Sequence, residues 1–264
     1  MADPRTVLSR PAPPPDLTLT YGDHPDQVAD LRFPGMPAAS RPLVIVVHGG
    51  FWRAEYDRSH TGPMAADLAG RGYPVAQLEY RRTGQPGGGW PGTLADVAAG
   101  VAALPALAAR ATPAGHPAPG PPVLVGHSAG GHLALWYAAA HPAAALSGVL
   151  ALAPVCDLVE AYRLDLDAGA VSALLGGPPD QVPDRYADAD PAQRAPGPFP
   201  TVVVHGVLDE QVPIALSRGY VTRARAAGSD VRLVELPGVE HFGLIDPLAS
   251  AWTTVTDVLR TLRS

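Results

Sequence analysis

The sequence predicts an α/β fold in which helices cover both faces of a mostly parallel, eight-stranded sheet. Short apolar runs bounded by Gly or Pro alternate with helix-length segments rich in Ala and Leu. The stretch Gly130–Cys156 contains no charged residue, and His141-Pro142 divides it into a helical half and a strand-like half, as in a buried helix followed by a parallel strand. A length of 264 residues, 47% of them hydrophobic, suits one domain with a large core.

Eight strands and five helices are expected along the chain. The strands are Leu17–Tyr21, Val28–Phe33, Leu43–Val47, Val75–Glu79, Val123–Val125, Val149–Leu152, Val202–Val204 and Val231–Leu236. The helices are Thr61–Arg71, Thr93–Arg110, Ala129–Ala140, Ile214–Ala227 and Ser250–Leu262. The polar stretch 22–26 predicts that the first two strands form an antiparallel hairpin at the sheet edge. Pro105 lies inside the second helix, so we expect that helix to kink or split there.

Three segments interrupt this alternation. Residues 1–16 contain several prolines and are expected to form a flexible N-terminus, followed by one domain over residues 17–264. Residues 111–122 are rich in Pro, Gly and Ala and predict a surface loop. Residues 157–200 are long, mixed and Pro-rich, with a helical piece at 168–175. We expect this insertion to lie over the carboxyl ends of the strands as a short lid.

Composition excludes several classes of function. Nineteen basic and twenty-five acidic residues give a net charge of −6, which offers no basic surface for nucleic acid or an anionic membrane. The single cysteine, Cys156, excludes an internal disulfide framework and a thiolate zinc cluster. No apolar run follows Arg5 as in a secretion signal, and His141-Pro142 disfavours a membrane span over 130–156. We therefore expect a cytoplasmic protein; its oligomeric state cannot be predicted from the sequence.

Ser128 is the first candidate catalytic residue. It lies in Gly126-His127-Ser128-Ala129-Gly130, between an apolar strand and a helix. A strand, a sharp turn and a helix form the setting of a nucleophile elbow, in which small neighbours let the backbone pack closely and the serine hydroxyl is exposed. The alternative is a Gly-rich turn in which Ser128 only caps the helix.

A serine nucleophile needs a general base and a carboxylate that orients the base. Asp209 follows the strand ending near His205, and His241 follows the last strand. The chain order Ser128, Asp209, His241 is the one produced when successive strand ends meet at one edge of a parallel sheet. The other carboxylates considered at this edge are Glu210, Glu240 and Asp157, and we expect Asp157 to begin the insertion.

The remaining histidines give no metal-binding pattern. No pair has the spacing of a zinc-binding helix, so we expect no metal and no cofactor. His127 lies inside the elbow and His205 ends a strand, which favours packing or backbone hydrogen bonds for both.

The segment His48-Gly49-Gly50-Phe51-Trp52 directly follows the third strand. Attack on an acyl group places negative charge on an oxygen, which fixed backbone N–H groups stabilise. We assign Gly50, Phe51 and Ala129 as the donors of this oxyanion hole, with Gly49 shaping the turn. Trp52 is expected to line a substrate pocket, although aromatic residues next to a site more often serve packing.

These motifs resemble those of the α/β-hydrolase superfamily, from about Leu17 to the last helix. His48–Trp52 is similar to the HGGxW signature of kynurenine formamidases (arylformamidases) and of small carboxylesterases. Glu79–Arg82 and Gly89–Pro91 resemble segments shared across these hydrolases, in which we expect Tyr80 and Arg81 to be structural.

The resemblance implies a serine hydrolase without a cofactor, acting on a small-molecule ester or amide through an acyl-enzyme. An arylformamidase-like activity, from N-formylkynurenine to kynurenine and formate, is the main expectation. The alternatives are a general short-acyl or aryl carboxylesterase and, in another class, a non-catalytic ligand-binding receptor on a hydrolase scaffold. The presence of Ser128, Asp209 and His241 together argues against the receptor.

Overall fold

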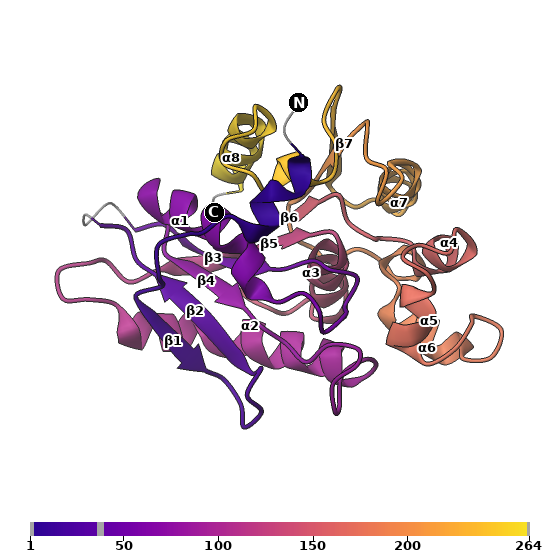
Figure 1. The fold of residues 1–264 in the computed structure, drawn as a ribbon, viewed down its shortest axis with the longest axis horizontal. Helices are drawn as coiled ribbons and strands as arrows, with labels where there is room; N and C mark the ends of the chain where they lie inside the picture. Colours follow the sequence, from indigo (N-terminus) through magenta and orange to yellow (C-terminus); the bar gives the residue numbers. More distant parts are fainter. Residues whose placement is uncertain (1–2, 36–39, 263–264) are drawn as a thin grey trace.

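The computed structural model describes residues 3–35 and 40–262, which fold around an eight-stranded sheet (Figure 1). The strand order is β1-β2-β4-β3-β5-β6-β7-β8. Strands β1 and β2 form the predicted antiparallel hairpin, β2 pairs antiparallel with β4, and all other neighbours are parallel. The strands are β1 Leu17–Thr20, β2 Val28–Arg32, β3 Pro42–Val47, β4 Val75–Leu78, β5 Gly120–His127, β6 Gly148–Leu152, β7 Thr201–Gly206 and β8 Val231–Leu236.

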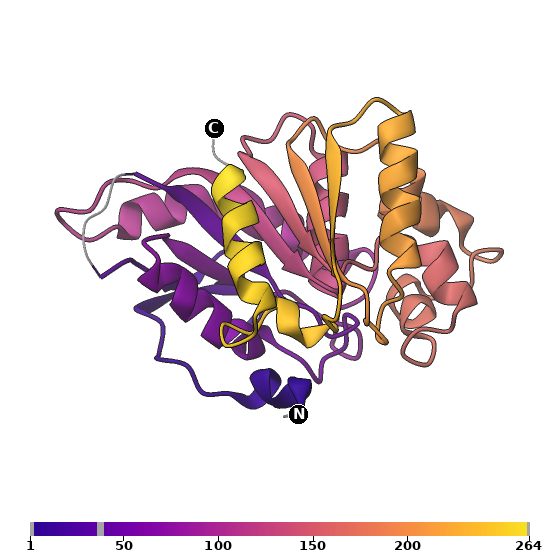
Figure 2. The ribbon, with the colours of Figure 1, turned by 90° about the horizontal axis from the view of Figure 1, so that it is seen from above.

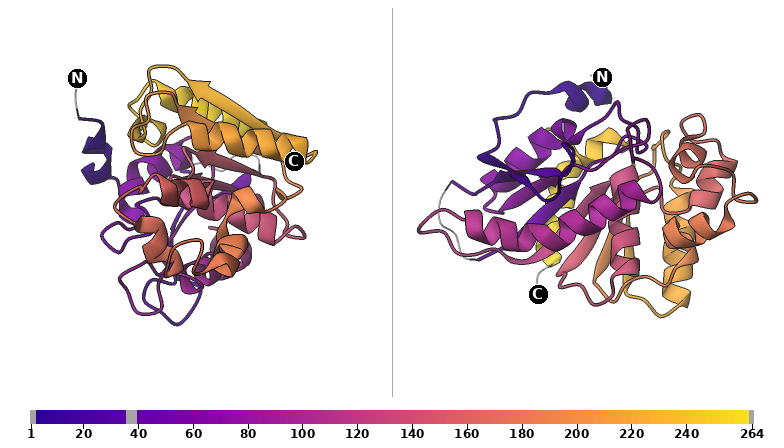
Figure 3. Two further views of the ribbon diagram at one scale, coloured as in Figure 1. Left: turned by 90° about the vertical axis from the view of Figure 1, so that its right-hand side faces the viewer. Right: turned by 90° about the horizontal axis from the view of Figure 1, so that it is seen from below.

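Helices cover both faces of the sheet, as predicted. Helices α1 and α8 lie on one face (Figure 2), and α2, α3 and α7 lie on the other (Figure 3). Successive residues of β3 alternate between the two cores, because side chains alternate across a strand. The helices are α1 Gly62–Gly70, α2 Gly92–Ala111, α3 Ala129–Ala140, α4 Leu158–Arg163, α5 Ala170–Leu175, α6 Pro183–Ala189, α7 Ala215–Ala226 and α8 Ala251–Thr261. Short 3₁₀ helices are η1 Pro4–Ser9, η2 Arg58–Thr61, η3 Pro191–Gln193 and η4 Phe242–Leu244.

Helix α2 continues through Pro105, so of the two outcomes expected there, a kink or a split, the split does not occur. Proline removes one helical N–H bond, but Val97, Val101, Leu104 and Ala108 are buried around that turn and hold the helix on the sheet. Among the described residues, α2 is the one helix whose length and apolar composition would allow it to cross a membrane. Here α2 packs against β2, β4 and α3.

The N-terminus also differs from its prediction. Its described part, from residue 3, is packed against the domain and is not a detached flexible tail. Val7 of η1 is completely buried in the core that contains α1 and α8. Arg10 forms a bidentate ion pair with Asp246. Arg32 donates to the carbonyls of Pro13 and Pro14. These are long-range contacts, which local proline content does not predict.

The insertion at 157–200 folds into α4, α5, α6 and η3 and lies beside α3 and α7 (Figure 1). Asp157 begins it, as expected: its side chain caps α4 at the Glu160 N–H and forms an ion pair with Arg223. A second ion pair, between Arg53 and Asp167, connects the insertion to the loop that follows β3. The two ion pairs therefore attach the insertion to α7 just before α4, and to the loop after β3 between α4 and α5.

Helix α3 begins at once after β5 and lies extremely close to the strands. A Cβ atom added to Gly130 would lie 2.0 Å from the carbonyl oxygen of Val47, and one added to Gly126 would lie 2.2 Å from that of Gly130. Both neighbours are backbone atoms, which cannot move aside as a side chain would. Only glycine fits at these two positions.

We predict that Gly130→Ala lowers the free energy of unfolding by more than about 3 kcal/mol, because the methyl group must displace the β3 backbone. Gly70→Ala is the matched control, since Gly70 is also helical and has open space where its Cβ would lie. We expect this control to be neutral or to stabilise by up to about 1 kcal/mol. Urea unfolding of both variants measures the difference; equal effects would contradict the close packing.

Candidate active site

Ser128 occupies a strained turn between β5 and α3. Its backbone angles are φ 56° and ψ −119°, a region that residues other than glycine rarely adopt. The Ser128 N–H donates to the carbonyl of Leu152 at 2.8 Å, and its carbonyl accepts from the His132 N–H at 3.1 Å, which holds the turn in place. The hydroxyl makes no capping hydrogen bond to α3. Ser128 therefore does not act as a simple helix cap.

His241 and Asp209 lie together at the carboxyl end of the sheet. The His241 Nδ1 atom is 2.6 Å from Asp209 Oδ2, and both residues are buried. Asp209 Oδ1 accepts two backbone N–H groups, from Gln211 at 2.9 Å and from Val212 at 2.8 Å. Although burial alone would raise the pKa of Asp209, hydrogen bonds from His205 and His241 lower it well below its usual range. The carboxylate is therefore ionised, and the proton on His241 lies on Nδ1.

The other carboxylates considered from the sequence have different roles. Glu240 accepts the N–H groups of Phe242 and Gly243, both at 2.7 Å, and so shapes the turn after His241. Glu210 is exposed. Within the described residues, Asp209 is the carboxylate that bonds to the ring of His241.

His205 is a second histidine on Asp209 that the sequence analysis did not assign to the site. Its Nε2 atom lies 3.2 Å from Asp209 Oδ2 and 2.9 Å from the carbonyl of Val212, and its Nδ1 lies 2.7 Å from Ser217 Oγ. Carboxylate and carbonyl oxygens both need a donor, so Nε2 carries the proton and Nδ1 accepts from the Ser217 hydroxyl. The sequence feature that could have indicated this contact is the position of His205, four residues before Asp209.

His127 supports His241 from the elbow. Its Nε2 atom lies 3.1 Å from the carbonyl of His241, and the two rings are 4.5 Å apart between centroids. Burial, together with the nearby His241, lowers the pKa of His127 well below its usual value, so its ring is neutral at pH 7. The expected backbone hydrogen bond of His127 is thus present, and it fixes the segment that carries His241.

Ser128 and His241 share one pocket of about 90 Å³ with Gly50 and Phe51. Gly50 and Phe51 have φ angles of 103° and 47°, which turn the loop after β3 sharply beside the elbow. A Cβ added to Gly49 would lie 3.0 Å from that of Ser128, which shows how closely this loop approaches the elbow. Within the described chain, the N–H groups of Gly50, Phe51 and Ala129 have no hydrogen-bond partner. The remaining lining residues are Arg5, Leu8, Tyr56, His60, His127, Asp167, Gln211 and Phe242.

The structure corrects the prediction for Trp52. Its side chain is completely buried, and its indole N–H donates to His132 Nδ1 at 3.1 Å. The other nitrogen of His132 lies 2.9 Å from the carbonyl of Ala189, and burial lowers the pKa of His132 to about 4. Trp52 therefore ties the loop to α3, and Phe51 is the aromatic residue of this loop that reaches the pocket.

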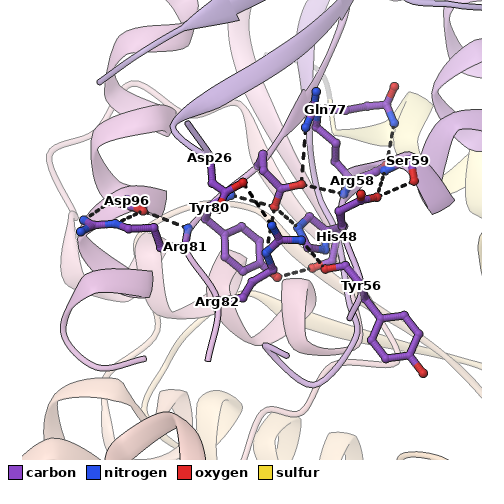
Figure 4. A network of polar contacts seen from close by, with 12 residues as sticks. Asp26, His48, Tyr56, Arg58, Ser59, Gln77, Tyr80, Arg81, Arg82 and Asp96 are labelled. Atoms are coloured by element: carbon purple, nitrogen blue, oxygen red, sulfur yellow. Dashed lines mark hydrogen bonds and ion pairs between the residues drawn. The ribbon is translucent and has the colours of Figure 1, made fainter. Parts of the chain in front are cut away.

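A buried polar network holds the start of the same loop (Figure 4). His48 Nε2 lies 2.9 Å from Glu79 Oε1, and the Tyr80 hydroxyl donates to the His48 carbonyl at 2.8 Å. Burial opposes the charge of Glu79, but His48 and Arg82 outweigh it and lower the pKa of Glu79 to about 2. Arg81 pairs with the buried Asp96, with Nη2 and Oδ1 2.6 Å apart. Tyr80 and Arg81 thus have structural contacts.

Comparison with known proteins identifies the family. A family profile described as BD-FAE matches residues 29–223, about three quarters of the chain. The chain belongs to the BD-FAE family. A curated relative is Esterase LipC of Mycobacterium tuberculosis (strain H37Rv), which is 30% identical over 259 residues that cover 86% of this chain and 60% of LipC. This BD-FAE chain thus spans about 60% of the length of the curated relatives that it matches.

Solved structures share the fold of this BD-FAE protein. Esterase B from Lactobacillus rhamnosis (HN001) superposes with a TM-score of 0.78 and 20% identity, covering 98% of this chain and 89% of that one. A truncated carbohydrate esterase from gut microbiota gives a TM-score of 0.78 and 18% identity, covering 94% and 96%. The sheet, the elbow and these neighbours establish the α/β-hydrolase fold.

We predict that His205→Leu lowers the free energy of unfolding at pH 7 by about 1–3 kcal/mol, because Asp209 loses one of its four N–H donors and Ser217 loses its acceptor. His205→Gln keeps an amide donor near the position of Nε2 and should recover part of this loss. Chemical denaturation of both variants measures it. A leucine variant as stable as the wild type would contradict the assigned hydrogen bonds.

Proposed function

We propose that this protein is a carboxylesterase that cleaves small esters through an acyl-enzyme on Ser128. The observation that carries the proposal is the shared pocket of Ser128 and His241, with His241 bonded to the ionised Asp209. A serine hydroxyl is a weak nucleophile until a neighbouring base accepts its proton. Because Asp209 keeps the His241 proton on Nδ1, Nε2 is left as the basic nitrogen.

In the first half of the reaction, Ser128 Oγ forms a bond to the ester carbonyl carbon while its proton passes to His241 Nε2. The N–H groups of Gly50, Phe51 and Ala129 are free to stabilise the negative oxygen of the tetrahedral intermediate. The bond from carbon to the alcohol oxygen then breaks. His241 returns its proton to that oxygen, and an alcohol leaves.

In the second half, a water molecule attacks the acyl group on Ser128 and gives its proton to His241. The Ser128 ester bond breaks, His241 protonates Oγ, and a carboxylic acid leaves. Asp209 stabilises the charged ring of His241 in both halves. His205 acts as a positioning residue, because it bonds to Asp209 and does not line the pocket.

The substrate class rests on the relatives and on the pocket. LipC and Esterase B are both named esterases, which favours an ester over the arylformamide expected first from the loop His48–Trp52. The pocket of about 90 Å³ has room for a small acyl group, since a single water molecule needs only about 10–15 Å³ of such space. Hydrolysis of a formamide would use the same residues and break a carbon–nitrogen bond, so arylformamidase activity is the second candidate.

The test is to measure kcat/KM for 4-nitrophenyl acetate and for N-formylkynurenine side by side. We predict efficient hydrolysis of the ester, at least about 10⁴ M⁻¹s⁻¹, and far slower turnover of the formamide. Ser128→Ala should lower the ester rate by at least about a thousandfold.

Ser40→Ala is the matched control, because Ser40 is exposed beside the amino end of β3 and should leave the rate unchanged. Faster turnover of the formamide would support the second candidate. Ester hydrolysis that persists in Ser128→Ala would overturn the mechanism.

A further inference from the structure

The N-terminal helix η1 supplies part of the wall of the Ser128 pocket. Arg5 and Leu8 line this pocket together with Ser128 and His241. The helix is held in place by the buried Val7 and lies against η2 and η4, the latter directly after His241 (Figures 1 and 2). A segment far from the elbow in sequence therefore reaches the space that a substrate would occupy.

Two neighbours hold the Arg5 side chain in the wall of the pocket. Its Nη2 atom donates to Gln211 Oε1 at 3.2 Å, and its guanidinium lies 5.6 Å from the centre of the Phe242 ring. Both residues come from the segments that carry Asp209 and His241. The guanidinium thus contacts the two segments that carry Asp209 and His241, although its chain position is remote from them.

The charge of Arg5 is not neutralised by the rest of the pocket. Asp167, the other permanently charged lining residue, is paired with Arg53. Burial lowers the pKa of His60 to about 4, and His127 is neutral for the same reason. Across the described chain, Arg5 has no carboxylate within ion-pair distance. Its other N–H groups remain able to bind an anion.

Arg5 also lines a second pocket next to the Ser128 pocket, and three carboxylates line this second pocket. Two of them already bind backbone N–H groups. Asp3 accepts the Arg5 backbone N–H at 2.9 Å, and Glu240 accepts those of the turn after His241. The third, Glu210, is exposed to solvent. These acids lower the local positive potential, but within the described chain none of them forms an ion pair or hydrogen bond with the Arg5 guanidinium, whose N–H groups other than the one bonded to Gln211 stay available.

We propose that Arg5 selects esters that carry a carboxylate close to the scissile bond. A planar guanidinium binds a carboxylate through two parallel hydrogen bonds, which a neutral substrate cannot form. Arg5 is a specificity-determining residue in this proposal, and the ester bond is still cleaved by Ser128. The inference rests on the proposed esterase activity and deepens it by naming the substrate class.

Two pairs of esters test the proposal and locate the carboxylate. The acyl-side pair is 4-nitrophenyl hydrogen succinate and the neutral 4-nitrophenyl pentanoate. The alcohol-side pair is 3-acetoxybenzoate and its methyl ester. For each pair, the ratio of kcat/KM for the anionic ester to that for the neutral ester is measured in the wild type, Arg5→Gln and Arg5→Glu.

We expect this ratio to fall about tenfold in Arg5→Gln for at least one pair, mainly through KM, and further in Arg5→Glu. High salt should weaken the preference of the wild type in the same direction. Arg232→Gln is the control of equal charge, since Arg232 is exposed at the amino end of β8, and its ratios should match the wild type.

A fall in the first pair places the carboxylate on the acyl chain, and a fall in the second places it on the alcohol. If the ratios stay unchanged in both Arg5 variants while Ser128 still hydrolyses the neutral esters, the proposed role of Arg5 is overturned. The proposed esterase activity then stands. No Ser128-dependent hydrolysis of any of the four esters would instead overturn the proposed function.

Discussion

The close approach of α3 to β3 and β5 is the constraint on which the rest of this structure depends. Gly126 and Gly130 have backbone atoms where other residues have a Cβ, so the chain can pass from strand to helix in a single residue. That residue, Ser128, therefore adopts a strained backbone conformation with a positive φ. The same approach brings Gly49 and its loop against the elbow, so that free N–H groups lie beside the serine.

The second organising feature is the way in which one buried carboxylate is satisfied. Asp209 receives two backbone N–H groups on one oxygen and two imidazole N–H groups on the other. Four donors compensate for its lost hydration and keep it charged. The charge in turn fixes the proton of His241 on Nδ1, the nitrogen that faces Asp209. The oxygens of Asp209 and Val212 likewise fix the proton of His205 on Nε2, and its Nδ1 atom accepts from the Ser217 hydroxyl.

Local sequence patterns predicted the eight strands, the elbow and the carboxyl-edge positions of Asp209 and His241, because apolar runs and glycine turns act within a few residues. Such local patterns do not predict contacts between residues that are far apart in the sequence. The sequence predicts a pocket position for Trp52, but its indole N–H donates to His132, eighty positions away. The Pro-rich N-terminus was expected to be flexible, yet Val7 is buried, and it was this packing that brought Arg5 to the pocket.

The central claim is that Ser128 is the nucleophile, and intact-protein mass spectrometry after fluorophosphonate treatment tests it most directly. In this reaction Oγ bonds to phosphorus and the phosphorus–fluorine bond breaks with loss of HF. The account predicts one adduct per chain in the wild type and in Ser40→Ala, and none in Ser128→Ala. A wild-type protein without an adduct, or an adduct that persists in Ser128→Ala, would contradict it.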